Sequence, residues 1–219
     1  MKRSVFLNVF AEARRSRNVV IEFDGIRLNI SKKVYEPHED SFLLAKAVSK
    51  YAGGKVLDVG CGSGIQSIVA ARKRAVWNVV GVDVSEKALD VSEENAELNG
   101  VGENCYFIQS NLFSGIGKNE GFDTIVFNPP YLPTDPDEVN EEGVAWDGGS
   151  NGRKVIERFL NELEGFLKPR GILLTIGSSL SNNGKTIRTL KKKGFRVEIV
   201  GEEKFFFEKL TVVKAQKIF

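Results

Sequence analysis

The chain of 219 residues has little cysteine, one histidine and no long apolar segment. Its two cysteines, Cys61 and Cys105, lie far apart and form neither a Cys-x-x-Cys pair nor a disulfide framework. This argues against a structural zinc site in the chain and fits a reducing compartment. The apolar stretch after Met1 is interrupted by Asn8 and Glu12, so it is too short for a signal-peptide core or a membrane span. We therefore expect a cytoplasmic protein without a membrane segment.

The chain also lacks a strong charge of either sign. Lys and Arg number 31 and Asp and Glu number 29, which gives a formal net charge of +2. A stand-alone nucleic-acid binder carries more concentrated positive charge, so a nucleic-acid substrate gains no support. The composition, 42% hydrophobic and 27% charged, is typical of a globular protein. We expect a single domain over residues 1–219, with an N-terminal extension at 1–33 and a catalytic core at 34–219.

The apolar pattern predicts an α/β fold. Two short runs, 19–23 and 26–30, flank Asp24-Gly25, which is a strong signal for a β-hairpin. A helical pattern covers 39–51, and from Lys55 onward short apolar runs alternate with helical segments. That alternation predicts a mostly parallel sheet with covering helices. Seven strands are expected near 55–59, 78–82, 104–108, 122–127, 172–176, 195–200 and 204–215, the last packing Phe205, Phe206 and Phe207 against the core.

The tetrapeptide Asn128-Pro129-Pro130-Tyr131 directly follows the apolar run 124–127. An Asn carbonyl and a proline carbonyl can accept both hydrogens of one planar NH2 group, which aims its nitrogen lone pair outward. Proline locks φ and keeps the preceding residue extended, so the turn is rigid before a substrate arrives. Tyr131 offers a flat face for a planar amide or base. A rigid turn without chemistry is the alternative for an isolated Pro-Pro pair.

A glycine-rich loop follows the strand expected at 55–59. Its glycines are Gly60, Gly62 and Gly64. The loop opens a helix at Ile65, an arrangement that binds a cofactor through backbone contacts. A dinucleotide fingerprint would need glycine in place of Ile65, so nicotinamide and flavin are disfavoured. Asp58 precedes the loop, and Asp83 ends the next strand, where a carboxylate can accept both ribose hydroxyls of a nucleoside.

These residues resemble the S-adenosyl-L-methionine site of class I methyltransferases, over about residues 34–215. The resemblance implies a Rossmann-like, seven-stranded, mostly parallel sheet with helices on both faces, after a short N-terminal hairpin. It implies that the loop and Asp58 serve the methionine part of the cofactor, that Asp83 holds the ribose and that Asn128 borders the cofactor. Asn111-Leu112 stands where related enzymes usually carry Asp before Leu to accept from the adenine amino group. An Asn carbonyl can accept that bond without charge assistance.

Two further segments, 34–41 and 143–152, resemble the HemK-related glutamine methyltransferases of archaea and eukaryotes, which modify the Gly-Gly-Gln glutamine of class I translation release factors. This resemblance implies a cofactor contact by Ser41. It also implies a substrate channel bordered by Trp146, Gly148 and Gly149, beside Asn128, Pro129 and Tyr131. Methyl transfer from a sulfonium needs no metal, so the acidic stretch 135–138 is expected to be a solvated loop. His38 is expected to be a surface or hinge residue.

Two alternatives stay open. Asn-Pro-Pro-Tyr also occurs in enzymes that methylate the adenine amino group of DNA or RNA, but these need a means of extruding the base and a basic surface. Alternatively, the chain is a cofactor-binding subunit that acts mainly through a complex. The segment Cys105–Gln109 is expected at the sheet edge, without proline or charge. The family resemblance implies a small zinc-binding activator protein as the partner there.

Overall fold

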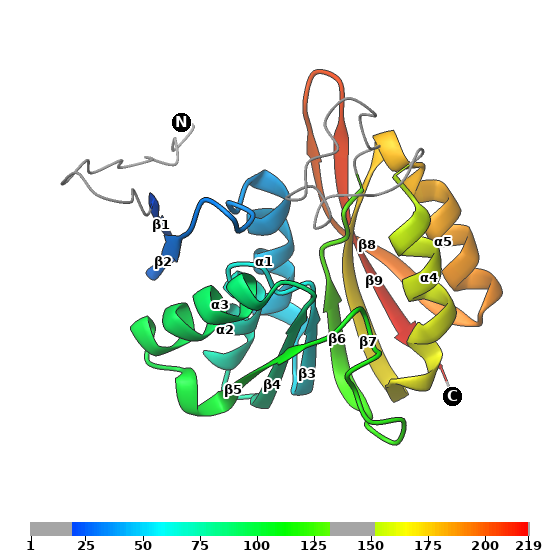
Figure 1. Ribbon diagram of the computed structural model, residues 1–219. Helices are drawn as coiled ribbons and strands as arrows, with labels where there is room; N and C mark the ends of the chain where they lie inside the picture. The colour runs from blue at the N-terminus through cyan, green and yellow to red at the C-terminus, as the bar shows by residue number, and fades with distance from the viewer. Residues whose placement is uncertain (1–18, 132–151, 219) are drawn as a thin grey trace.

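The computed structural model describes residues 19–131 and 152–218. A hairpin of β1 (Val19–Phe23) and β2 (Ile26–Ile30) precedes the alternating strands and helices (Figure 1). The helices are α1 (Glu39–Tyr51), α2 (Ile65–Ala71), α3 (Glu86–Leu98), α4 (Lys154–Glu162) and α5 (Asn183–Lys192). The strands of the main sheet are β3 (Gly54–Val59), β4 (Val76–Asp83), β5 (Cys105–Gln109), β6 (Phe122–Phe127), β7 (Leu167–Ser178), β8 (Phe195–Lys204) and β9 (Lys209–Lys217).

The main sheet has seven strands in the order β5-β4-β3-β6-β7-β9-β8. The first five run parallel, and β9 is antiparallel to both of its neighbours. Val59 pairs with Val82 and Phe127, so the carboxyl ends of the central strands meet at one edge. Open parallel sheets bind ligands at that edge, where the strand order reverses. The predicted fold class is confirmed, including the short N-terminal hairpin.

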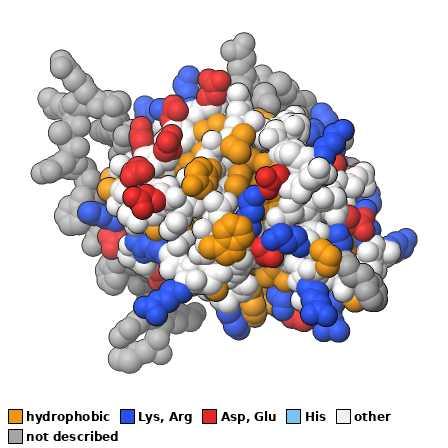
Figure 2. Space-filling model, turned by 90° about the horizontal axis from the view of Figure 1, so that it is seen from below, with side chains coloured by type: hydrophobic (Ala, Val, Ile, Leu, Met, Phe, Trp, Pro, Cys, Tyr) orange, Lys and Arg blue, Asp and Glu red, His pale blue; other side chains and the backbone are white. Residues whose placement is uncertain are grey.

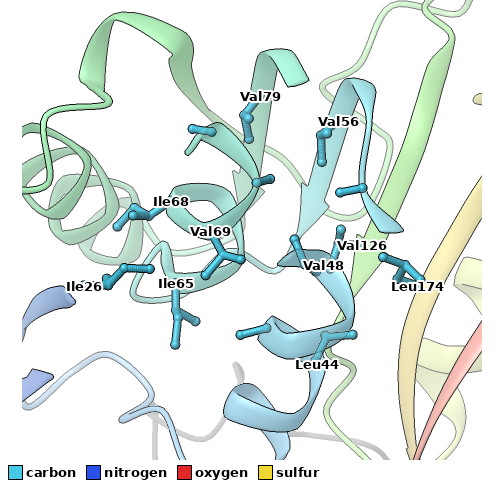
Figure 3. Packing of buried hydrophobic residues seen from close by; sticks show 14 of the residues in the cluster. Ile26, Leu44, Val48, Val56, Ile65, Ile68, Val69, Val79, Val126 and Leu174 are labelled. Carbon is cyan, nitrogen blue, oxygen red and sulfur yellow. The ribbon is translucent and has the colours of Figure 1, made fainter. Parts of the chain in front are cut away.

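Helices cover both faces of the sheet, with α1, α2 and α3 on one side and α4 and α5 on the other (Figure 1). Successive strand residues point to opposite faces: Val56 packs in one hydrophobic cluster and Leu57 in the other. Figure 3 shows the first cluster, in which Leu44 and Val48 of α1 face the strands. Both side chains are fully buried, and each contributes about 1.5–3 kcal/mol to the free energy of unfolding.

The N-terminal hairpin is fastened to α3 by side-chain amides. Asn29 N donates to Asn95 Oδ1 (2.8 Å), and Asn95 Nδ2 donates to Asn29 O (3.1 Å). Asn99 makes the same pair of bonds with the backbone of Arg27 (3.1 and 2.7 Å). These bonds satisfy backbone groups that an edge strand would otherwise leave unpaired. Asn95 Nδ2 also donates to Ser63 O (3.0 Å), so one side chain joins the hairpin to the glycine loop.

The aromatic run 205–207 lies in a turn, and the prediction that it packs in a strand was wrong. Strand β8 continues to Lys204, which pairs with Lys209 at the start of β9. Phe205 N donates to Glu208 O (2.7 Å) and closes the turn, so the alternation that would direct these rings inward stops. The rings of Phe206 and Phe207 are 93% and 84% exposed.

The end of the molecule opposite this turn carries mixed charge. In Figure 2, Lys and Arg side chains lie among Asp and Glu side chains around an apolar centre. This face therefore offers no extended patch of one sign to a nucleic acid. Within 19–131 and 152–218, no helix has the length and apolar character needed to cross a membrane.

Candidate active site

A cavity of about 370 Å³ opens at the carboxyl ends of β3, β4, β5 and β6. Its wall includes ten of the residues that the sequence predicts for the site: Ser41, Gly60, Gly62, Asp83, Asn111, Leu112, Asn128, Pro129, Pro130 and Tyr131. The structure does not bring Asp58 or Gly64 to this wall. Trp146, Gly148 and Gly149 lie outside the described residues, as does the acidic stretch 135–138.

The glycine loop takes a left-handed backbone conformation. Gly60 and Gly62 have φ values of 67° and 55°, where a side chain is disfavoured although an added Cβ would meet no atom within 4 Å. Gly62 N donates to Asp83 Oδ2 (3.0 Å), which fixes the loop to the end of β4. Gly64 has φ 80°, and a Cβ there would lie 3.1 Å from Ser92 of α3. Gly64 therefore serves close packing beneath the loop.

Asp58 supports the loop from inside the protein. Its Oδ2 accepts from Ser67 N (3.0 Å) and Ser67 Oγ (2.7 Å) in the first turn of α2. Burial raises the pKa of Asp58 to about 7, against the opposing effect of these bonds. A direct contact between Asp58 and a cofactor stays a prediction.

Asp83 stands at the cavity end of β4 with both oxygens oriented by the backbone. Oδ1 accepts from Ser85 N (3.0 Å), and Oδ2 accepts from Gly62 N. Burial raises the pKa of this carboxyl above its usual range. Each carboxylate oxygen can accept a further bond, so two adjacent hydroxyls could be bound together.

The loop after β5 is held in an unusual conformation. Leu112 has φ 55°, which is uncommon outside glycine and occurs often at ligand sites. Ser110 Oγ donates to Leu112 O (2.8 Å) and stabilises this backbone. Asn111 Oδ1 accepts from Arg158 of α4 (2.8 Å). The sequence did not identify Arg158, because the two residues are far apart along the chain.

Asn128 has a fixed amide with an unused acceptor. Its Nδ2 donates to Asp40 Oδ2 (3.0 Å), and because a carboxylate accepts such bonds, this orients the amide. Among the described residues, Asn128 Oδ1 is buried without a hydrogen-bond partner, as is Gln66 Oε1 on the same cavity wall. Leaving a buried acceptor unpaired costs about 1–3 kcal/mol, which a ligand donor would recover.

Asp40 organises the side of the cavity that contains Asn128 and Tyr131, and this residue was not predicted from the sequence. This buried carboxylate accepts from Tyr35 Oη (3.0 Å), Ser41 N (2.6 Å), Asn128 Nδ2 and Tyr131 Oη (3.3 Å). Burial, together with the negative charge of Asp40, raises the pKa of both tyrosines, so their hydroxyls stay protonated and donate. The available signal was its place directly before Ser41. Stacking of Tyr131 on a substrate stays a prediction. His38 is exposed, as expected, and its ring contacts Tyr35 edge-on.

The strand order, with its antiparallel β9, and the cavity at the carboxyl ends of the parallel strands are those of the Rossmann-like methyltransferase fold. A family profile described as methyltransferase small domain matches residues 36–207.

Two curated relatives narrow this class. The chain is 43% identical to the "Putative protein N5-glutamine methyltransferase" of Methanocaldococcus jannaschii over 91% of this chain and all of that protein. It is 33% identical to human "Methyltransferase HEMK2" over 84% of this chain and 90% of that protein. The solved E. cuniculi Mtq2-Trm112 complex, described as responsible for eRF1 methylation, shares the fold with a TM-score of 0.64 and 24% identity, over 84% of this chain and 99% of that one. The chain belongs to the HemK-related glutamine methyltransferases within the methyltransferase small domain family.

Proposed function

We propose that this protein methylates the side-chain amide nitrogen of the Gly-Gly-Gln glutamine in a class I translation release factor. The observation that carries the proposal is the buried, unpaired Oδ1 of Asn128 beside the Pro129 carbonyl. A glutamine NH2 group brings one donor for this unpaired oxygen and a second for the Pro129 carbonyl. The relatives named as glutamine methyltransferases favour this amide over an adenine amino group, which has the same planar shape.

The cofactor in this proposal is S-adenosyl-L-methionine, which supplies an electrophilic methyl group when bound. Asp83 would hold the ribose hydroxyls, the loop at Gly60 and Gly62 the methionine part, and Asn111 the adenine amino group. Unpaired Gln66 Oε1 offers an acceptor for a charged amine. These groups fit a ligand that joins a nucleoside to an amino acid.

The acceptors of the site orient the glutamine. With both N–H bonds accepted by Asn128 and Pro129, the nitrogen lone pair points into the cavity. The proton leaves after the nitrogen has gained its fourth bond, so the site needs no strong base. This agrees with a wall on which Asp40 is already committed to four donor residues.

Asn111→Asp is expected to tighten cofactor binding by about fivefold. A carboxylate beside Arg158 would form a charge-assisted bond and accept the adenine amino hydrogen about 1 kcal/mol more favourably than a neutral amide. Titration calorimetry with S-adenosyl-L-homocysteine measures the change, and Asn111→Ala provides the matched loss of the acceptor. Equal affinities for all three proteins would contradict this role of Asn111.

One experiment tests the function. The protein is incubated with labelled S-adenosyl-L-methionine and the release factor, or with a factor whose Gly-Gly-Gln glutamine is replaced, and the methyl group is located by mass spectrometry. A methyl group on that glutamine, absent from the replaced factor, supports the proposal. Methylation of a free oligonucleotide instead would indicate the adenine enzyme, and binding of cofactor without transfer to any substrate would indicate a non-catalytic subunit.

A small zinc-binding activator protein is the proposed partner, and strand β5 is its proposed binding site. The Mtq2 chain of similar fold was solved as a complex with Trm112. Here β5 is the outermost strand, and its Tyr106 and Ile108 side chains are 54% and 39% exposed. Such an edge can accept a partner strand through its free backbone groups.

Tyr106→Lys/Ile108→Lys is expected to weaken activator binding at least tenfold, because charged side chains oppose strand addition at an edge. Copurification and titration with the activator measure the effect. Val20→Lys is the matched control, since Val20 is equally exposed on an edge strand of the small hairpin. Unchanged activator affinity in the β5 variant would exclude this edge as the interface.

A further inference from the structure

The most exposed large apolar side chains of the described residues stand together at one place. Phe206 and Phe207 contact each other edge-on, with ring centroids 4.6 Å apart, at the tip of the β8–β9 hairpin. Scattered single apolar residues are ordinary on protein surfaces, but adjoining exposed aromatics mark interaction sites. The tip projects beyond the rest of the described fold (Figure 1).

Hydrogen bonds hold the β8–β9 hairpin that carries this tip. Its two strands pair from Phe195 with Lys217 up to Lys204 with Lys209. Glu208 accepts a hydrogen bond from Ser178 Oγ, and Lys209 N donates to Ser179 Oγ (3.0 Å). The two rings are therefore presented on an ordered support, which lowers the entropy lost when they bind a partner.

The tip points to the same side of the molecule as the active site. Strand β7 is parallel to β6, and β9 is antiparallel to both β7 and β8. Strand β8 therefore runs in the same direction as β6. Its carboxyl end thus lies at the edge of the sheet where Asn128 follows β6. Strand β5, the proposed activator edge, is at the other end of the strand order.

A second, smaller cavity of about 110 Å³ lies between the turn and the Asp40 cluster. Phe205 and Glu208 of the turn form part of its wall. Tyr35, Asp40 and Tyr131 line both this cavity and the large one, so the two cavities are adjacent and share the wall at the Asp40 cluster. Phe205, next in sequence to the exposed rings, and Asp40, which orients Asn128, thus line one cavity.

We infer that the Phe206–Phe207 tip is a docking element for the protein substrate, which inserts an apolar surface patch against the rings while its glutamine reaches Asn128. The inference rests on the proposed function and names the substrate-binding surface of that site. The shared wall of the two cavities places the turn beside the active site, which favours the substrate over a second copy of this chain or a lipid surface. Aromatic side chains, Phe among them, are enriched in the core of protein–protein interfaces.

The test is the double variant Phe206→Ser/Phe207→Ser. We expect its KM for the release factor to rise at least tenfold while kcat changes less than about twofold, because the rings contribute to binding of the substrate and lie outside the site of methyl transfer. Its Kd for a release factor with the glutamine replaced should rise equally, and its Kd for S-adenosyl-L-homocysteine should not change. Ile199→Ser, which removes another exposed apolar side chain from the same hairpin, is the matched control and should leave all values unchanged.

Three results would overturn the inference. The first is an unchanged KM and Kd for the release factor. The second is an equal loss in the Ile199 control, which would indicate a general effect on the hairpin. The third is a change confined to self-association or to binding of anionic phospholipid vesicles, which would assign the tip to another occupant. Failure of the wild-type protein to methylate the factor at all would instead refute the proposed function.

Discussion

Asn128→Ala is expected to lower kcat on the release factor by about 10²- to 10³-fold, a loss typical of removing one preorganised polar group from an active site. Asn128 supplies an unpaired acceptor whose amide is held by the bond from Nδ2 to Asp40, so its orientation is set before the substrate binds. The Kd for S-adenosyl-L-homocysteine should change little, because the cofactor depends mainly on the loops after β3, β4 and β5. Steady-state kinetics and calorimetry measure the two quantities.

Asn78→Ala is the control for this variant. Asn78 is half-buried in β4 but does not line the cavity, so its loss should leave kcat close to that of the wild-type protein. If Asn128→Ala kept more than about a tenth of the wild-type kcat, Asn128 would not be an acceptor in the transition state.

Asp40→Asn is expected to lower kcat by about 10²-fold, the cost of misplacing a reacting group by about an ångström. The substitution keeps the shape but replaces one carboxylate oxygen by an NH2 group. The new NH2 group would face Ser41 N at the Oδ1 position and Asn128 Nδ2 at the Oδ2 position, so either orientation sets a donor against a donor. Asn128 would then lose its fixed orientation. The free energy of unfolding should also fall by about 1–3 kcal/mol.

Tyr35→Phe separates the two effects of Asp40. It removes one donor from Asp40 Oδ1 and leaves the bond from Asn128 to Oδ2 intact. Its kcat should stay within about threefold of wild type, since the bond that orients Asn128 is kept. If Asp40→Asn matched Tyr35→Phe in kcat, Asp40 would be a structural residue without influence on Asn128.

Local sequence signals predicted most of the fold. Asp24 and Gly25 both adopt positive φ, as the two-residue hairpin turn requires. The alternation of apolar runs located all seven strands of the sheet, because burial on two faces leaves a strong pattern. The prediction for Phe205–Phe207 was wrong because it rested on hydrophobicity, and hydrophobicity alone predicts burial. The pairing of Lys204 with Lys209, which determines the turn, is a contact between strands and leaves no local signal.

Residues of the candidate site were predicted where they are contiguous in the sequence. Asn128 to Tyr131 and the glycine loop are contiguous segments whose backbone conformation follows from proline and glycine. Asp40 and Arg158 were missed because their roles depend on partners that only the tertiary fold supplies. Asp58 was predicted to serve the cofactor from its position before the loop, but the structure shows its hydrogen bonds directed to α2.

The bonds of Asn95 connect the N-terminal hairpin to the glycine loop. Because one amide joins β2 to the carbonyl of Ser63, the hairpin and the loop behave as one cooperative unit against local opening. Lifting the hairpin from α3 removes the bonds between Asn95 and Asn29, which help to hold the Asn95 amide in place for its bond to Ser63 O. Conversely, a ligand that orders the loop must stabilise the hairpin by the same free energy, since such coupling is reciprocal. A segment that does not line the cavity is thereby coupled to the loop that would hold the cofactor.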